Sequence, residues 1–249
     1  QGGGSHGAFT WGVLDRLLEE ERIQVEGVSG VSAGAMNATM LAQGLMQGGA
    51  AGAKETLDEF WHSVAIKVSF KSMRDSFLDR VKEYMSKPLS LRLNSQKGLD
   101  SILAASQFNP LEKNPLEPII KGLVDFKRLQ KESPVKLYIG ATEVKTGKLR
   151  LFNESELTSS AVLASACLPN AITKGVEVDG EIYWDGGFSS NPAIFPLIFD
   201  CESNDIVTVL LGPLERADAP DNNADIMARV AELTFNSTYL REMRAITEA

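Results

Sequence analysis

The stretch VSGVSAGAMN, residues 28–37, contains the pattern Gly30-x-Ser32-x-Gly34. A serine in this setting sits on a strained bend between a strand and a helix, and it needs small neighbours because bulk would collide with the adjoining elements. A β-rich segment precedes Ser32 and an Ala- and Met-rich segment follows it. The stretch therefore predicts a strand, a sharp turn and a helix. Ser32 is a candidate nucleophile, with the free N–H groups of the helix directed toward developing negative charge.

Helical and strand patterns alternate along the rest of the chain. Apolar residues at helical spacing predict helices over residues 7–21, 33–46, 58–68, 158–167 and 224–247. Apolar runs and turn signals predict strands over residues 23–28, 135–142, 149–152 and 206–211, and a hairpin over residues 176–183. Such alternation predicts an α/β fold in which helices cover both faces of a parallel or mixed sheet.

We expect residues 1–249 to form one domain, because single α/β domains commonly reach this size. Residues 69–134 interrupt the regular pattern with five prolines, interspersed charges and no strong strand signal, so we interpret them as a variable helical cap or insertion. The chain enters a glycine loop directly at Gln1. We therefore expect the strand that supports this loop to lie upstream of residue 1.

The charge of the chain indicates which kinds of binding partner are unfavourable. The formal net charge is −8, from 25 Lys and Arg against 33 Asp and Glu, and no basic run occurs, which argues against nucleic-acid binding. The same acidity predicts that any transient membrane contact is apolar.

Cys167 and Cys201 lack a C-x-x-C spacing, so no metal site is expected. No apolar stretch approaches the ~20 residues that span a bilayer, which predicts a cytoplasmic protein, at most peripheral to a membrane. The oligomeric state is not indicated.

The residue that takes the proton from Ser32 is not a histidine in the usual triad order. The chain has two histidines: His6 precedes the serine, and His62 lies in FWHSV on a predicted helix. The histidine of an α/β-hydrolase triad follows the serine late in the chain. Asp185, in the sequence YWDGG at the end of a predicted hairpin strand, is the alternative. An aspartate near its ordinary pKa of ~3.9 is a weak base, so it requires a hydrogen bond to Ser32 and partial desolvation.

The chain opens with the glycine loop QGGGSHG, residues 1–7. Successive glycines let the main chain present N–H groups without obstruction, which suits an oxyanion hole, where each donor contributes ~10²–10³ in rate. The same letters contain G-x-G-x-x-G, which also occurs in dinucleotide-binding loops. The alternative is a nucleotide-binding oxidoreductase, but the dinucleotide-binding pattern gives no role to the later stretch GVSGVSAG.

Three motifs occur in order along the chain, G-x-G-x-x-G, G-x-S-x-G and D-G-G. With the stretches GAFTWGVLDRLLEE, ASACLPNAI and YWDGGFSSNP, they resemble the patatin-like phospholipase family from Gln1 to Pro213. The resemblance implies a three-layer α/β/α fold with a mostly parallel central sheet. It also implies a calcium-independent lipid acyl hydrolase that uses a Ser-Asp dyad and an acyl-enzyme intermediate, without a cofactor or metal.

The resemblance also implies roles for particular residues. Ser32 would be the nucleophile, and Asp185 would be the base that activates Ser32 and later water. Gly2, Gly3 and Gly4 would form the oxyanion hole. The glycines that support these motifs are Gly7, Gly30, Gly34, Gly186 and Gly187. The sequence departs from the family at His6, where many members carry Arg or Lys, so the need for a fixed charge there stays open.

A function of another class is also compatible with these residues. A non-catalytic lipid-binding protein on the same fold would keep the glycine turns without using Ser32 as a nucleophile. The sequence does not separate phospholipid, lysophospholipid, triacylglycerol, thioester and polyester substrates, because that choice depends on the shape of a pocket.

Overall fold

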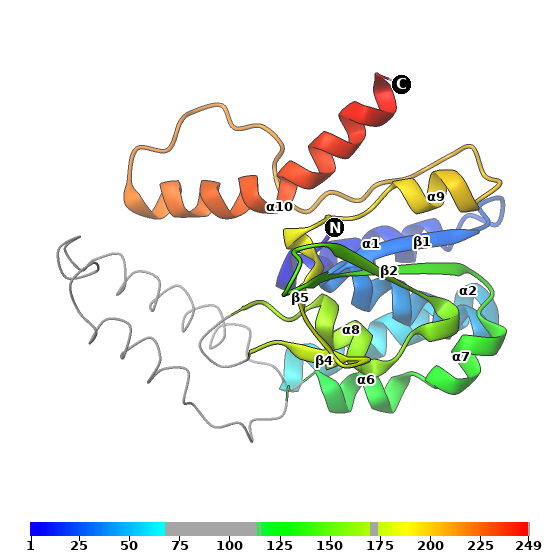
Figure 1. Ribbon diagram of the computed structural model, residues 1–249. Helices are drawn as coiled ribbons and strands as arrows, with labels where there is room; N and C mark the ends of the chain where they lie inside the picture. Colours follow the sequence, from blue (N-terminus) through cyan, green and yellow to red (C-terminus); the bar gives the residue numbers. More distant parts are fainter. Residues whose placement is uncertain (68–113, 115, 170–173, 249) are drawn as a thin grey trace.

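The computed structural model describes residues 1–67, 114, 116–169 and 174–248 (Figure 1). Five strands form one sheet: β1 (Gly27–Val31), β2 (Lys136–Glu143), β3 (Leu149–Asn153), β4 (Val176–Val178) and β5 (Glu181–Asp185). The α-helices are α1 (Gly7–Leu17), α2 (Ala33–Lys67), α6 (Glu117–Leu123), α7 (Phe126–Glu132), α8 (Ser159–Ser165), α9 (Phe195–Asp200) and α10 (Asn223–Thr247). Helices α2, α6 and α7 lie on one side of β1 and β2, and α9 lies on the other. The predicted α/β fold with helices flanking the sheet is confirmed.

The sheet is mixed, with β2 at its centre. β1 pairs with β2 in parallel over 136–140, whereas β3, β5 and β4 join by antiparallel pairings. The prediction of a mostly parallel sheet is therefore wrong for the described strands. Short connections explain two of these pairings, because the tight turns after β2 and β4 can only produce the antiparallel pairs β2–β3 and β4–β5. The chain between β1 and β2 includes helices α2, α6 and α7, the kind of crossover that a parallel pair requires.

The pairing places two strand ends next to each other. β3 occupies one edge of β2 over 138–142, so β1 and β5 share the opposite edge. β1 ends with Val31 opposite Gly140, and β5 ends with Asp185 opposite Ala141. Since 140 and 141 are consecutive, the ends of β1 and β5 meet at the middle of β2. The residue after β1 is Ser32.

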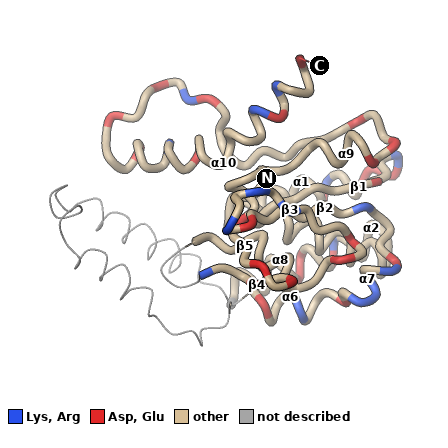
Figure 2. The backbone as a smooth tube through the Cα atoms, in the orientation of Figure 1, with Lys and Arg blue, Asp and Glu red and all other residues tan. Residues whose placement is uncertain are grey.

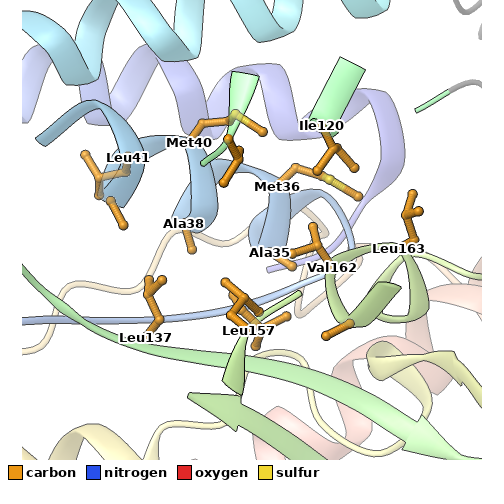
Figure 3. Packing of buried hydrophobic residues seen from close by; sticks show 14 of the residues in the cluster. Ala35, Met36, Ala38, Met40, Leu41, Ile120, Leu137, Leu157, Val162 and Leu163 are labelled. Atoms are coloured by element: carbon orange, nitrogen blue, oxygen red, sulfur yellow. The ribbon is translucent and has the colours of Figure 1, made fainter. Parts of the chain in front are cut away.

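The hydrophobic core lies between α2 and the sheet. β2 is buried over most of its length, as its apolar sequence predicts for a central strand. In Figure 3, Ala35, Met36 and Met40 of α2 lie close to Ile120 of α6 and Val162 of α8. Small residues on the first turns of α2 let this helix approach the sheet closely, which fixes the orientation of the helix that follows Ser32.

Helix α2 covers both of the helices that the sequence predicts between residues 33 and 68. It bends at Gly48 and Gly49, where the backbone leaves the helical conformation and Gly49 has φ 60°. A positive φ is readily adopted by glycine alone, so the predicted stop at these residues is a kink between two packed helical segments.

Two other predictions differ from the structure. Residues 206–211 are extended but join no strand: Val209 O accepts from the amine of Gln1, and Leu211 N donates to Gln1 Oε1. Most of the predicted insertion, 69–113 and residue 115, lies outside the described residues. In its later part, Ile120 of α6 and Leu129 of α7 are buried in the main core.

Charged residues of both signs are interspersed over the described surface (Figure 2). Lys54 pairs with Asp15 at 3.3 Å, and Lys145 pairs with Glu181 at 2.7 Å. None of the helices in these segments is both long enough and apolar enough to span a bilayer.

Candidate active site

Ser32 occupies a strained turn between β1 and α2. Its φ is 55°, a left-handed conformation that is uncommon for residues other than glycine. A Cβ on Gly30 would lie 2.5 Å from Gly34 O, and a Cβ on Gly34 would lie 2.9 Å from Gln1 O. Both motif glycines are therefore required by close backbone approach. The predicted turn and helix are confirmed, and the strand before them covers Gly27–Val31 rather than the predicted residues 23–28.

Backbone contacts fix this turn from both sides. Ser32 O accepts from Met36 N at 3.2 Å, which starts the hydrogen bonding of α2. Ser32 N donates to Ser165 Oγ at 2.9 Å, and Ser165 Oγ donates in turn to Gly140 O at 2.6 Å. The first N–H groups of α2 have no acceptor within the helix, so its positive end faces the serine.

Asp185 is held rigidly at the end of β5. Its backbone N–H donates to Cys167 O at 2.7 Å, and its carbonyl accepts from Thr142 Oγ1 at 2.8 Å. Its side-chain Oδ1 accepts from Gly187 N at 2.8 Å. The carboxyl group is completely buried. These bonds point the second carboxyl oxygen, Oδ2, away from the Gly187 amide.

The two glycines after Asp185 are required by packing. A Cβ on Gly186 would lie 2.2 Å from Gly140 O, and a Cβ on Gly187 would lie 2.2 Å from the ring of Phe235. Any side chain at either position would push the turn away from β2 or from α10. The D-G-G sequence thus fixes where the Asp185 carboxyl lies.

The electrostatics of Asp185 suit a proton acceptor. Burial raises the pKa of Asp185 from 3.8 to about 7, against the lowering effects of hydrogen bonds from Gly187 N–H and the Ser32 hydroxyl. The hydroxyl is thus near enough to act on the carboxyl group, yet Asp185 Oδ2 has no hydrogen bond of ordinary geometry within the described residues. The hydroxyl and an unoccupied carboxyl oxygen are therefore neighbours, as the junction of β1 and β5 on β2 requires.

The glycine loop lies directly against the serine. A Cβ on Gly2 would lie 2.7 Å from Ser32 Cβ and 3.0 Å from Val31 O. The Gly2 N–H donates to Asn191 Oδ1 at 2.7 Å. The amides of Gly3 and Gly4 donate to no acceptor among the described residues. Gly4 has φ 58°, which favours glycine at this position.

Neither imidazole takes part in this arrangement. His62 is exposed on α2, where its Nδ1 is 3.3 Å from Asp58 Oδ1 and its ring packs against Trp11. His6 is exposed just before α1. The next residue, Gly7, packs closely against α2, since a Cβ on it would lie 2.6 Å from Ala33 Cβ. Among the described residues, neither histidine ring bonds to the serine or the aspartate of the candidate site.

Sequence reasoning missed the residues that hold the candidate groups in place. Ser165 and Asn191 both lie within stretches that carried the family resemblance, ASACLPNAI and YWDGGFSSNP, but neither was singled out. Their partners are main-chain groups far away in the sequence. A single sequence carries no signal for such pairs beyond the clustering of small polar residues.

Two surface hollows lie elsewhere on the molecule. One, of about 450 Å³, is lined by residues of α2, α6 and α7, and the other, of about 280 Å³, by residues of β2, β3 and α9. Neither includes Ser32 or Asp185, so neither is an ester-binding pocket for these groups.

The chain was compared with known protein families, curated proteins and solved structures. A family model described as Patatin-like phospholipase matches residues 1–198. No curated protein matches the chain. Among solved structures, VipD from Legionella pneumophila is similar at 19% sequence identity with a TM-score of 0.40. That match covers 75% of this chain and 44% of VipD, so the chain spans less than half of VipD.

Proposed function

Because this chain belongs to the patatin-like phospholipase family, we propose that it hydrolyses fatty-acyl esters with Ser32 as nucleophile and Asp185 as base. The observation that carries the proposal is the buried carboxyl of Asp185, with its pKa raised to about 7 beside the Ser32 hydroxyl. An aspartate with its ordinary pKa is too weak a base for a hydroxyl. One that titrates near neutral pH both accepts and returns a proton.

In the first half of the reaction, Asp185 Oδ2 takes the proton as Ser32 Oγ attacks the ester carbonyl. The amides of Gly3 and Gly4 and the positive end of α2 stabilise the oxyanion that forms. Collapse of this intermediate breaks the ester bond, and the alcohol leaves with the proton held by Asp185. The acyl group is then bonded to Ser32 Oγ.

In the second half, water attacks the acyl-enzyme. Asp185 takes a proton from the water, the hydroxide adds to the carbonyl, and the fatty acid leaves as Ser32 recovers its proton. No cofactor is needed for either half. We propose that the reaction is calcium-independent, and that activity persists in excess EGTA.

The proposed substrates are lipid acyl esters, with phospholipids first among them. The support for this class is the family to which residues 1–198 belong. The net charge of −8 favours an apolar contact with a lipid surface over attraction to anionic headgroups.

The direct test compares wild type with Ser32→Ala. We expect wild type to hydrolyse p-nitrophenyl acyl esters of increasing chain length and to react covalently with a fluorophosphonate. Ser32→Ala should lose both activities while it stays folded. Undiminished labelling of Ser32→Ala would refute the assignment of the nucleophile. Fatty-acid binding by a wild-type protein with no esterase activity would favour a non-catalytic lipid-binding protein.

A further inference from the structure

We infer that Ser165 is a positioning residue for the reaction, and that its hydroxyl holds Ser32 in its reactive conformation and in register with Asp185. The inference rests on the proposed function and adds to it a residue that touches neither substrate nor reacting atoms.

The Ser165 hydroxyl both accepts and donates a hydrogen bond. Its Oγ accepts from Ser32 N at 2.9 Å and donates to Gly140 O at 2.6 Å. A serine hydroxyl has one donor, which here is committed to the Gly140 carbonyl. Ser165 is fully buried, so water does not replace either bond. The hydroxyl is therefore a fixed bridge between the nucleophile turn and the central strand.

Ser32 needs such a bridge because of its backbone conformation. A non-glycine residue held at positive φ costs about 1–3 kcal/mol and persists only when its surroundings enforce it. The Ser32 N–H comes directly after Val31, which makes the last pairing of β1 with β2, opposite Gly140. A buried N–H without an acceptor costs about 1–3 kcal/mol more. Ser165 Oγ is the acceptor that satisfies it.

The second bond connects this turn to Asp185. Gly140 precedes Ala141 on β2, and Ala141 is the residue that pairs with Asp185. Ser165 thus ties the Ser32 amide to the strand that sets the position of the carboxylate. This path, from the Ser32 amide through Ser165 and β2 to Asp185, controls the distance between the hydroxyl and the carboxyl group. Ser32 and Asp185 are far apart along the chain, so the backbone alone does not fix that distance.

The position of Ser165 itself is well determined. Helix α8 begins at a Thr158 cap, whose side chain accepts from Ala161 N, and its residues Val162 and Leu163 pack into the core (Figure 3). Core residues in such close packing move little. A residue at the last position of this short buried helix is thus suited to place a hydroxyl within a few tenths of an ångström.

The test uses Ser165→Ala, Ser165→Cys and the control Ser29→Ala. Ser29 is a serine on β1 whose buried Oγ has no hydrogen bond to any described residue, so its removal deletes a hydroxyl without deleting such a bond. Ser165→Cys fills the same site with a group that is a weak donor and a weak acceptor. For each protein we would measure kcat and KM on a short p-nitrophenyl ester, the fluorophosphonate labelling rate and the melting temperature.

We expect Ser165→Ala to lower kcat and the labelling rate about 10- to 100-fold, with KM changed less than about twofold, because misplacing reacting groups by about 1 Å costs rate rather than binding. Ser165→Cys should fall between this variant and wild type. Ser29→Ala should stay within about twofold of wild type, since it removes no hydrogen bond.

Several outcomes would overturn the inference. A folded Ser165→Ala protein that labels at the wild-type rate would show that the bridge does not position Ser32. If Ser165→Ala fails to fold, a folded Ser165→Cys protein with a wild-type rate would have the same meaning. Failure of both variants to fold would assign Ser165 to folding alone. A wild-type protein that neither labels nor hydrolyses esters would instead refute the proposed function, and the positioning role with it.

Discussion

The side-chain oxygen of Asn191 accepts a hydrogen bond from the amide of Gly2 at 2.7 Å, although the two residues are 189 positions apart in the chain. Asn191 is almost fully buried and lies just after the D-G-G turn. The bond joins the segment that carries the proposed base, Asp185, to the glycine loop that carries the proposed oxyanion donors. The amides of Gly3 and Gly4, by contrast, donate to no acceptor in the part of the chain that the structure describes.

Removing this bond should loosen the glycine loop. In Asn191→Ala the Gly2 N–H loses its acceptor, which costs about 1–3 kcal/mol of stability, and the amides of Gly3 and Gly4 are no longer held against Ser32. We expect kcat to fall about tenfold or more, because preorganised donors contribute strongly to oxyanion stabilisation. Steady-state kinetics on a short ester and a thermal melt measure the two effects.

The matched control is Gln130→Ala. Gln130 Nε2 on α7 donates to Leu157 O at 2.9 Å, so this variant also loses one hydrogen bond between a side chain and the backbone. It should lower the melting temperature without lowering kcat. Equal losses of kcat in the two variants would mean that the Asn191 bond contributes stability only.

The rate should depend on the ionisation of Asp185. Because burial raises the pKa of this carboxyl to about 7, we expect kcat/KM to increase about tenfold per pH unit below about pH 7 and to level off above it. Stopped assays with a short ester from pH 5 to 9 would show the profile. A rate that is already independent of pH near 5 would contradict the assignment of Asp185 as the base.

The pH profile needs a histidine control, because an imidazole is the usual general base in serine hydrolases. Since neither ring contacts the candidate groups, we expect the double variant with His6→Ala and His62→Ala to keep most of its activity and the same apparent pKa in its rate profile. If this variant were as inactive as Ser32→Ala, a Ser–His mechanism would become the better explanation.

The raised pKa of Asp185 has a consequence for stability. Between about pH 4 and pH 7 the folded protein keeps the proton while the unfolded chain has released it, so the free energy of unfolding falls as pH rises through this range. The full effect on the free energy of unfolding is at most about 4 kcal/mol.

We therefore expect Asp185→Asn to melt at a higher temperature than wild type at pH 8, with the difference shrinking toward pH 4. Asp185→Asn should also be nearly inactive. A melting difference independent of pH would show that the carboxyl is not protonated in the folded protein.

Much of the local structure could be predicted from the sequence, because the signals are themselves local. Gly30 and Gly34 around Ser32 predict a turn that only small residues permit, and the structure places backbone atoms within 3 Å of their missing side chains. The largely apolar run that forms β2 predicts a buried strand, and this signal too is local.

The direction of the strands and the partners of the site could not be predicted in this way. The sequence 206–211 reads as a strand, but a strand needs a neighbour to pair with, and in the described chain its hydrogen bonds go to Gln1. The engagement of the Gly2 amide depends on Asn191, a residue whose role is set by the fold rather than by its neighbours in sequence. Pairing between distant segments is where single-sequence reasoning stops.

The last prediction concerns α10, which lies beyond the residues matched by the family model. The Phe235 ring of this helix packs 5.5 Å from the ring of Phe188 and lies against Gly187, whose amide holds the Asp185 carboxyl. Phe235→Ala should lower kcat several-fold, because the turn after Asp185 loses its support, and Phe235→Leu should restore part of it. Leu233→Ala, a change at an exposed residue of the same helix, should leave kcat unchanged. Equal kcat values for Phe235→Ala and Leu233→Ala would show that α10 covers this turn without positioning it.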